Sequence, residues 1–373
     1  MRGVDIALVK DEADMKAFVD LHWKIYAGDS NWVPPLKAEV RKLLDTHEHP
    51  FWKFSRRAIF LARRGSETVG RIAAIVDDNY NRFHQEKFGA WGFFECENDP
   101  DAAAALFQSA EEWLRSQGMT FMRGPLNPST NYELGLLIEG FEYPPAVMMN
   151  YNPPYYQTLV ESCELTKEKD LRALLVEGLG FNSERVERLA KRVMKQNRVS
   201  IRTFNKKHFV SDLYLLREIY NDAWNDNWGF VPLTDEELTE IASNLRRIAD
   251  FDLVFFIYLE TEPVGVALVL PDINPLLKRF NGRIGVLGLL KILLYRKEIR
   301  GVRCALFGVK KQYQKLGIPL VVFDYMNRMG LQKKEYKYLE LSWTLEDNAA
   351  INQFAEELGG RFYKRYRIFS KAL

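Results

Sequence analysis

The segment KKQYQKLGIP, residues 310–319, follows the apolar run VRCALFGV and precedes the helical pattern LVVFDYMNRM. This order places Gly317 between a buried strand and the first turn of a helix. Backbone N–H groups at a helix N-terminus have no partner within the helix, and the helix dipole makes that end electropositive. Because glycine also lets an anion approach the backbone, the segment predicts a phosphate site, with an ordinary strand-to-helix turn as the alternative.

A second set of polar residues lies in the alternating run YKYLELSW. Tyr338, Glu340 and Ser342 share one face of the predicted strand, since successive side chains of a strand point to opposite faces. An amine with a pKa of about 10.4 must lose a proton before it attacks a carbonyl group. Glu340 is therefore the candidate catalytic base, and a solvated or ion-paired glutamate is the alternative.

A metal site is not predicted. His47 and His49 lie beside Asp45 in the run THEHP, but the sequence places no third ligand near them. A structural or exposed role for both histidines is the expectation.

The composition indicates roughly two globular domains. Of the 373 residues 47% are hydrophobic, and 52 Lys and Arg nearly balance 50 Asp and Glu, so no net field attracts nucleic acid or a membrane to the whole molecule. Cys96, Cys163 and Cys304 share no short spacing, which argues against a disulfide framework and favours a reducing cytoplasm. The N-terminal run MRGVDIALVKDEADM is acidic where a signal peptide has an apolar core.

An internal repeat organises the chain. The segment ETVGRIAAIVDDNYN begins at Glu67 and EPVGVALVLPDINP begins at Glu262. Three residue pairs recur at one constant spacing: Gly70 and Gly265, Asp77 and Asp272, and Asn79 and Asn274. We therefore predict one α/β fold used twice, with domains at residues 1–165 and 198–373 joined by linking helices over residues 166–197.

The second copy is predicted in more detail from hydrophobic periodicity. Its expected strands are residues 198–204, 253–261, 263–270, 301–309, 336–343 and 361–370, and its expected helices are residues 207–224, 234–248, 314–331 and 347–358.

Residues 300–373 resemble the second half of the GCN5-related N-acetyltransferases (GNATs). The run Gln314, Lys315, Leu316, Gly317, Ile318, Pro319 is similar to the pyrophosphate signature of that family. Asn348 begins the helical pattern NAAINQFAEELGG, as an Asn does in the family, and FYKRYRIFSK is similar to its last strand. The resemblance implies two tandem GNAT-like domains, each a mixed, mostly antiparallel sheet flanked by helices, as in N-myristoyltransferases and the FemABX transferases.

The resemblance also implies a co-substrate, acetyl-CoA or another acyl-CoA, and no metal. Its pyrophosphate would lie on the amides of residues 315–319, and Asn348 would belong to the same site. Its pantetheine arm would pair with the edge of VRCALFGV, where an N–H group of Phe307, Gly308 or Val309 polarises the thioester carbonyl.

The chain departs from the family pattern at the general acid. Family members often have a tyrosine seven residues after the Asn that begins the helix, and this chain has Ala355 there. Tyr313, Tyr363 or a water molecule are the candidate replacements. Pro319 also lacks an N–H group that a phosphate could use, so weaker coenzyme binding is expected.

The first copy departs further from the pattern. Its equivalent loop, ECENDPDAAAA, has no glycine. Four carboxylates in this loop would repel a pyrophosphate group: Glu95, Glu97, Asp99 and Asp101. We therefore predict that the first copy binds no coenzyme A.

The predicted function is acyl-CoA-dependent N-acyltransfer by the second copy, in which an amine of a small molecule or peptide attacks the thioester directly. One alternative is FemABX-like transfer from aminoacyl-tRNA, the only case in which nucleic acid binding is expected, and another is a catalytically silent CoA-binding protein. The tRNA alternative depends on a basic cluster: Lys278, Arg279, Arg283, Arg296, Lys297, Arg300 and Arg303. The sequence leaves the oligomeric state open.

Two segments bear on the acceptor. The run MMNYNPPYYQTL, which begins at Met148, predicts either a domain junction or a loop that lines the acceptor site. The apolar run IGVLGLLKILLY, residues 284–295, is too short to span a bilayer, so no integral membrane association is expected. It favours a buried helix, with a lid over the acyl channel or a contact with a hydrophobic acceptor or membrane surface as alternatives.

Overall fold

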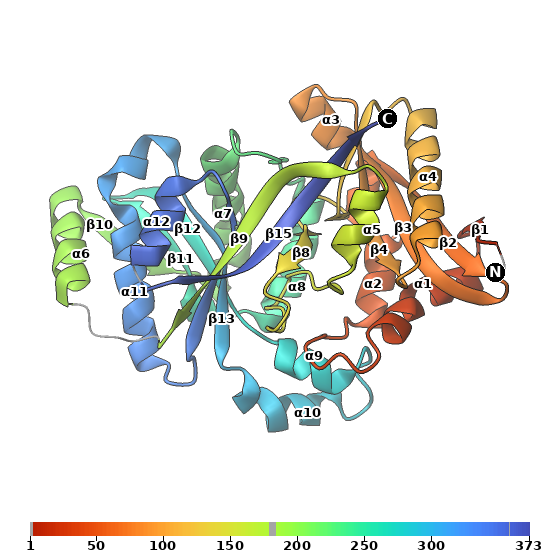
Figure 1. Ribbon diagram of the computed structural model, residues 1–373. Coiled ribbons are helices and arrows are strands. Elements are labelled where there is room, and N and C mark those ends of the chain that lie inside the picture. Colours follow the sequence, from red (N-terminus) through yellow and green to blue (C-terminus); the bar gives the residue numbers. More distant parts are fainter. Residues whose placement is uncertain (1–2, 179–183, 358) are drawn as a thin grey trace.

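The computed structural model describes residues 3–178, 184–357 and 359–373, in which strands and helices alternate (Figure 1). In the first half the strands are β1 (Asp5–Leu8), β2 (Ser55–Arg64), β3 (Glu67–Asp77), β4 (Phe88–Cys96), β5 (Phe121–Gly124), β6 (Leu126–Asn127), β7 (Glu133–Leu134), β8 (Leu136–Glu139) and β9 (Thr166–Glu177). Its helices are α1 (Glu12–Ile25), α2 (Lys37–Leu44), α3 (Asp78–His84), α4 (Pro100–Ser116) and α5 (Tyr156–Ser162).

The second half begins with α6 (Glu184–Asn197). Its strands are β10 (Val199–Thr203), β11 (Val254–Leu259), β12 (Glu262–Pro271), β13 (Gly301–Val309), β14 (Tyr338–Leu345) and β15 (Arg361–Ala372). Its other helices are α7 (Phe209–Trp224), α8 (Asp235–Ile248), α9 (Asn274–Phe280), α10 (Gly288–Tyr295), α11 (Ile318–Gln332) and α12 (Ala349–Glu357), with the 3-10 helix η5 (Lys311–Leu316) before α11.

One 13-stranded sheet joins both halves in the order β1-β2-β3-β4-β5-β15-β9-β14-β13-β12-β11-β10, with β8 paired to β15. Strands β1 to β4 are antiparallel and β4 is parallel to β5, and β10 to β14 repeat this arrangement. The repeated residues occupy equivalent positions: Asp77 at the end of β3 accepts a hydrogen bond from Asn79 N (3.0 Å), and Asp272 just after β12 accepts one from Asn274 N (3.3 Å).

The two halves exchange their last strands. Strand β9 pairs with β14 of the second half, β15 pairs with β5 of the first half, and β9 and β15 pair with each other from Thr166↔Ser370 to Leu175↔Arg361. Figure 1 shows both strands crossing the middle of the molecule. The halves are therefore interlocked, and the C-terminal strand completes the sheet of the first half as well as that of the second.

The prediction of linking helices over residues 166–197 is wrong for β9. Its sequence, TKEKDLRALLVE, begins with charged residues and ends in a run that is buried on both faces of the sheet. A strand covered on both faces shows no alternation of apolar and polar residues, so periodicity does not reveal it. Only α6 in this segment is helical, and residues 179–183 lie outside the described residues.

The expectation of a buried helix over residues 284–295 is also wrong. The exposed fractions of Leu290, Leu293 and Leu294 on α10 are 52%, 63% and 62%. Figure 1 shows α10 at the edge of the molecule, outside the layers that cover the sheet. An apolar run without periodicity indicates burial only where another layer packs over it, and no such layer covers this helix in the described residues. Nor does the described part of the chain contain a helix with the length and apolarity needed to cross a membrane.

Candidate active site

Strands β13 and β14 separate along their length. Their parallel pairing ends at Cys304↔Leu341, beyond which β13 pairs with β12 and β14 pairs with β9. Lys310 N, just after β13, donates a hydrogen bond to Val264 O on β12 (2.8 Å). Along an antiparallel pair of strands, successive N–H groups point alternately toward the partner strand and away from it. The N–H groups of Phe307 and Val309 therefore point away from β12, toward the side from which β14 has departed.

Gly308, the third residue predicted at this edge, has a packing role. Its N–H group points toward β12 by the same alternation. A Cβ atom added at Gly308 would lie 2.0 Å from the indole ring of Trp224, the last residue of α7. The glycine thus lets α7 pack closely on β13, and contact with the co-substrate is not required to explain it.

The predicted phosphate loop is brought together at the start of α11. Gln314, Lys315 and Leu316 end the 3-10 helix η5, and Ile318 and Pro319 begin α11. Between them Gly317 has a φ of +75°, a left-handed conformation that favours glycine. Gln314 Nε2 donates to Val309 O (3.2 Å), which attaches the loop to the end of β13.

Tyr313, Asn348 and Glu340 stand on separate elements. Tyr313 donates from its hydroxyl group to Glu262 (2.7 Å) on the surface beside the loop. Asn348 is exposed, and its side chain accepts a hydrogen bond from Ile351 N (3.4 Å) at the start of α12. Glu340 pairs with Arg303, six residues before Val309, which is about 20 Å along the strand. Tyr313 and Glu340 therefore do not form one site.

Glu340 and Tyr363 are brought together, but in the core. Glu340 is 1% exposed and accepts hydrogen bonds from the Tyr363 hydroxyl and from Ser342 Oγ, while Arg303 Nε donates to Ser342 Oγ (2.8 Å). Burial and the charge of Glu340 raise the pKa of Tyr363 far above its ordinary value, which makes it a poor proton donor. Arg303 is buried as well, so it is not a surface residue of the predicted basic cluster.

This network predicts a stability effect for Tyr363→Phe. The variant leaves an oxygen of Glu340 without its donor, so we expect the free energy of unfolding to fall by about 1–3 kcal/mol in urea denaturation. Tyr143→Phe is the matched control, because it keeps the ring that packs against Tyr363 and removes a hydroxyl group that accepts an exposed hydrogen bond from Arg361. Unchanged unfolding together with lost turnover would instead assign Tyr363 a chemical role.

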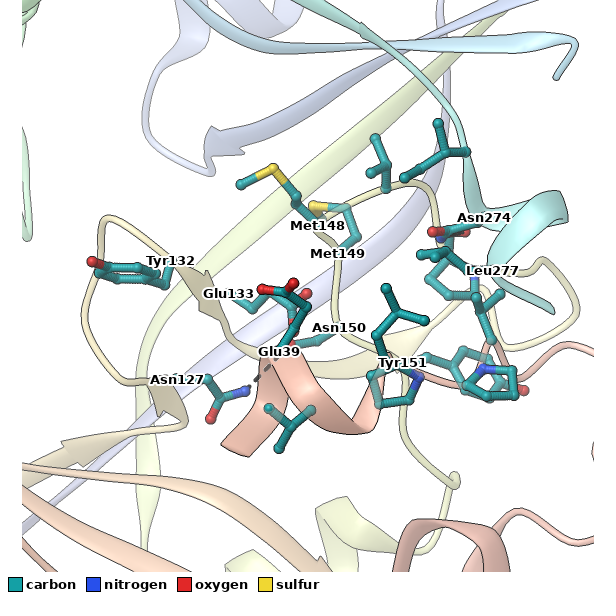
Figure 2. Close-up of a pocket in the computed structure, with 18 of the residues that line it drawn as sticks. Glu39, Asn127, Tyr132, Glu133, Met148, Met149, Asn150, Tyr151, Asn274 and Leu277 are labelled. Carbon is teal, nitrogen blue, oxygen red and sulfur yellow. Dashed lines mark hydrogen bonds between the residues drawn. The ribbon is translucent and has the colours of Figure 1, made fainter. Parts of the chain in front are cut away.

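A cavity of about 1040 Å³ lies between the two halves of the chain. Its walls are mostly apolar and come from residues 32–43, residues 147–152, and helices α8, α9 and α10. Figure 2 shows Met148, Met149, Tyr151 and Leu277 in its lining. The run that begins at Met148 thus lines a cavity, whereas none of residues 307–319 does.

The buried network lies directly behind the wall of this cavity. Arg303 Nη1 donates to Val147 O (2.8 Å) and to Met148 O (3.1 Å), and both of these residues line the cavity. Arg303 is also one residue from Cys304, where β13 and β14 cease to pair. The cavity wall and the point of strand separation are therefore connected through a single side chain.

Glu133 is a titratable residue in this wall that the sequence did not reveal. It lies on β7 and faces the cavity in Figure 2, with its side chain exposed to the cavity. The surrounding protein raises the pKa of its carboxyl group, with the charge of Arg303 acting in the opposite direction. Nearby, Asn127 Nδ2 donates to Asn150 Oδ1 (3.4 Å). The run STNYELGLL has no periodicity or motif that marks Glu133, because only the fold places it in the cavity.

At the first-half end of the cavity, Glu95 is buried rather than part of an exposed loop. It pairs with His22 Nε2 (2.8 Å) and accepts a hydrogen bond from the Tyr156 hydroxyl (2.6 Å). Burial and the charge of Arg71 hold the pKa of His22 below its ordinary value. Glu95 therefore belongs to a buried polar cluster and not to the predicted anion-repelling loop.

The N-terminus of α4, where a first-copy pyrophosphate would lie, is capped by Asp99. Its carboxylate accepts from Ala102 N (3.1 Å) and pairs with Arg64 (2.6 Å). A carboxylate at this position occupies the amides that a phosphate would use. That the first copy binds no coenzyme A stays a prediction, with Asp99 as its main physical basis.

Metal ligands are not clustered in the described ranges of the chain: no group of three or more His, Cys, Asp or Glu side chains there is placed to hold an ion. His49 is buried, and its Nδ1 accepts a hydrogen bond from Phe51 N (3.4 Å). His47 is exposed on the preceding turn.

Comparison of sequences finds relatives of nearly the same length. The chain is 36% identical over 373 residues to a protein named bacterial ceramide synthase from Caulobacter vibrioides (strain NA1000 / CB15N), a match that covers 98% of this chain and 96% of that protein. It is 34% identical over 372 residues to Protein YghO of Escherichia coli (strain K12), covering 96% and 93%. No protein-family model matches the chain.

Comparison of structures identifies the fold. A tandem GNAT protein from the clavulanic acid biosynthesis pathway aligns with 99% of this chain and 98% of its own, with a TM-score of 0.55 and 10% sequence identity. This likeness confirms the predicted α/β fold of two tandem GNAT-like domains.

Proposed function

Because this chain belongs to the same family as the bacterial ceramide synthase of Caulobacter vibrioides and has a tandem GNAT fold, we propose that it is an acyl-CoA-dependent N-acyltransferase whose acceptor is a long-chain amine. The observation that carries the proposal is the apolar cavity of about 1040 Å³ behind the point where β13 and β14 separate. A ceramide is an amide of a fatty acid with a long-chain amino alcohol, so the name of the relative describes this class of reaction.

The donor half of the proposed site is the second copy. The acyl-CoA pyrophosphate would lie on the amides of residues 315–318 at the start of α11, and the thioester carbonyl would accept from the N–H group of Phe307 or Val309. Tyr313 belongs to the 3-10 helix that leads into this loop. Gly308 acts only by letting Trp224 pack behind the strand.

The acceptor half is the cavity. A wall of methionine, leucine and proline side chains suits an alkyl chain better than a peptide or a small polar amine, because burial of apolar surface is the main source of affinity there. We place the amino group near Glu133, at the wall that Arg303 connects to the strand separation.

Glu133 then takes the role first assigned to Glu340. Its carboxylate accepts a proton from the ammonium group, the amine nitrogen bonds to the thioester carbon, and the C–S bond breaks. The nitrogen loses a second proton, which passes to the sulfur so that coenzyme A leaves as the thiol, and Glu133 releases its proton to solvent. Glu340 acts indirectly. It accepts a hydrogen bond from Ser342, and Ser342 in turn holds Arg303 against the cavity wall.

The test is a thiol-release assay with acyl-CoA donors and a series of primary amines that differ only in alkyl chain length. We expect kcat/KM to rise about fourfold per added methylene until the cavity is filled, since each buried methylene contributes about 0.8 kcal/mol. Short amines and lysine-containing peptides are the comparison acceptors. Equal turnover of short and long amines, or turnover of peptides alone, would exclude the lipid amine.

A further inference from the structure

The segment that joins β12 to β13 presents an apolar surface outside the cavity. On and before α10, the large exposed apolar side chains that do not line the cavity are Val286 (104%), Leu287 (62%), Leu290 (52%), Leu293 (63%) and Leu294 (62%). We call these five residues the α10 surface. Scattered exposed apolar residues are ordinary, but a contiguous group of this kind on one short segment indicates a binding surface.

Basic residues flank the α10 surface along the chain. The exposed basic residues from α9 to β13 are Lys278, Arg279, Arg283, Lys291, Arg296, Lys297 and Arg300. Glu298 is the single acidic residue from 274 to 300. Glu298 pairs with Arg279 (3.0 Å). Within the residues that the structure describes, Arg283, Lys291, Lys297 and Arg300 have no ion-pair partner. The charge is local, because the whole chain carries a formal net charge of only +2.

The same segment forms part of the cavity wall. Ile284 and Ile292 line the cavity, as do Leu277 and Phe280 of α9. The segment therefore has one apolar face toward the cavity and another toward the exterior, and the two are separated only by the thickness of a helix. Figure 1 shows α9 and α10 together at the edge of the molecule, away from the end of β13 that leads into the predicted phosphate loop.

We propose that the α10 surface docks on a bilayer that contains anionic lipids, and that a long-chain amine passes from that bilayer into the cavity beside α9 and α10. Apolar side chains ringed by Lys and Arg are typical of helices that lie in the membrane interface, where the chains enter the acyl region and the cations meet lipid phosphates. A second copy of this chain fits less well, because a symmetric contact through this surface would bring like charges together. The docking stands on the α10 surface itself, and only the delivery of the amine rests on the proposed function.

The first measurement is co-sedimentation with vesicles in the absence of acyl-CoA. The wild-type protein is expected to bind phosphatidylglycerol-containing vesicles and to bind pure phosphatidylcholine vesicles about tenfold or more weakly. The combined variant Leu290→Ser, Leu293→Ser, Leu294→Ser should reduce binding about a hundredfold, and Arg283→Gln with Lys291→Gln about tenfold. Because these side chains are exposed, the variants should unfold at the wild-type temperature.

Matched controls change similar residues elsewhere on the surface. Val210→Ser with Leu331→Ser removes apolar side chains that are 64% and 51% exposed, and Lys207→Gln with Lys334→Gln removes two exposed cations. Both controls should bind vesicles as the wild type does. Equal losses in the controls and in the α10 variants would overturn the proposal.

A second readout separates docking from catalysis. With a long-chain amine dispersed in detergent, the α10 variants should release coenzyme A at the wild-type rate, and with the amine in anionic vesicles they should lose most of that rate. Absence of turnover in detergent for every amine would reject the proposed function and leave the vesicle result to decide docking. Failure of the wild type to bind anionic vesicles, or self-association that the leucine variant abolishes, would reject docking.

Discussion

Replacement of Gly317 by aspartate is expected to raise the dissociation constant for acyl-CoA by about a hundredfold or more, with the fold intact. Gly317 is the N-cap of α11, and aspartate is both a favoured N-cap residue and one of the few that tolerate a φ of +75°. Its carboxylate, however, would occupy the amides proposed for the pyrophosphate. A like charge about 4 Å from the pyrophosphate costs about 1 kcal/mol in water and about 4 kcal/mol near a protein surface.

The measurement is the thermal shift on adding acetyl-, longer acyl- and free coenzyme A. A ligand at a hundred times its dissociation constant stabilises the wild type by about 2.7 kcal/mol, and Gly317→Asp should show no shift. Gly317→Asn is the control, because it has the same size and backbone preference without the charge, and it should retain part of the shift. Wild-type binding in Gly317→Asp would move the co-substrate away from this loop.

Glu133→Gln is expected to lower kcat about 10²- to 10⁴-fold while leaving the dissociation constant for acyl-CoA unchanged. This is the range that a positioned general base contributes, and the amide keeps the size of the side chain but cannot accept the proton. In the wild type the rate should rise with pH through a pKa above the ordinary glutamate value of 4.5, because the carboxylate must be ionised to act. The variant should lose this limb of the pH profile.

The same substitution should stabilise the protein at neutral pH. Because the surrounding cavity wall raises the pKa of Glu133 in the folded state, the folded protein favours the protonated form, and that contribution to stability is lost as pH rises through the folded pKa. The neutral glutamine does not incur this loss. Thermal unfolding of Glu133→Gln should therefore occur above the wild-type temperature at pH 7, and the difference should vanish below pH 4.5.

Glu39→Gln provides the control for both effects. Glu39 also lines the cavity, but it lies on α2 and its carboxylate is 3.8 Å from Arg247. We expect little change in kcat and no gain in stability. If both variants lose activity equally, the cavity needs negative charge in general and Glu133 is not the base.

The sequence by itself determined the features that depend on neighbouring residues. Alternation and turn residues placed β10 to β14 within a few residues of their observed bounds, and the glycine between a strand and a helix identified the left-handed Gly317 at the start of α11. The constant spacing of Asp77 and Asp272 revealed two copies of one arrangement, which the tandem GNAT fold confirms. Each of these features is a local pattern, because backbone preferences and strand or helix periods extend over only a few residues.

Only the tertiary structure decided which of these residues are buried and what they contact. The alternating sequence around Glu340 predicted an accessible base, yet Tyr363 of β15 packs over Glu340 and buries it in the core. No sequence pattern marks Glu133, which lines the cavity. The exchange of β9 and β15 and the exposure of α10 were likewise absent from local patterns. Burial and pKa depend on the layers that pack from distant parts of the chain, so a site built between two halves is specified by their packing.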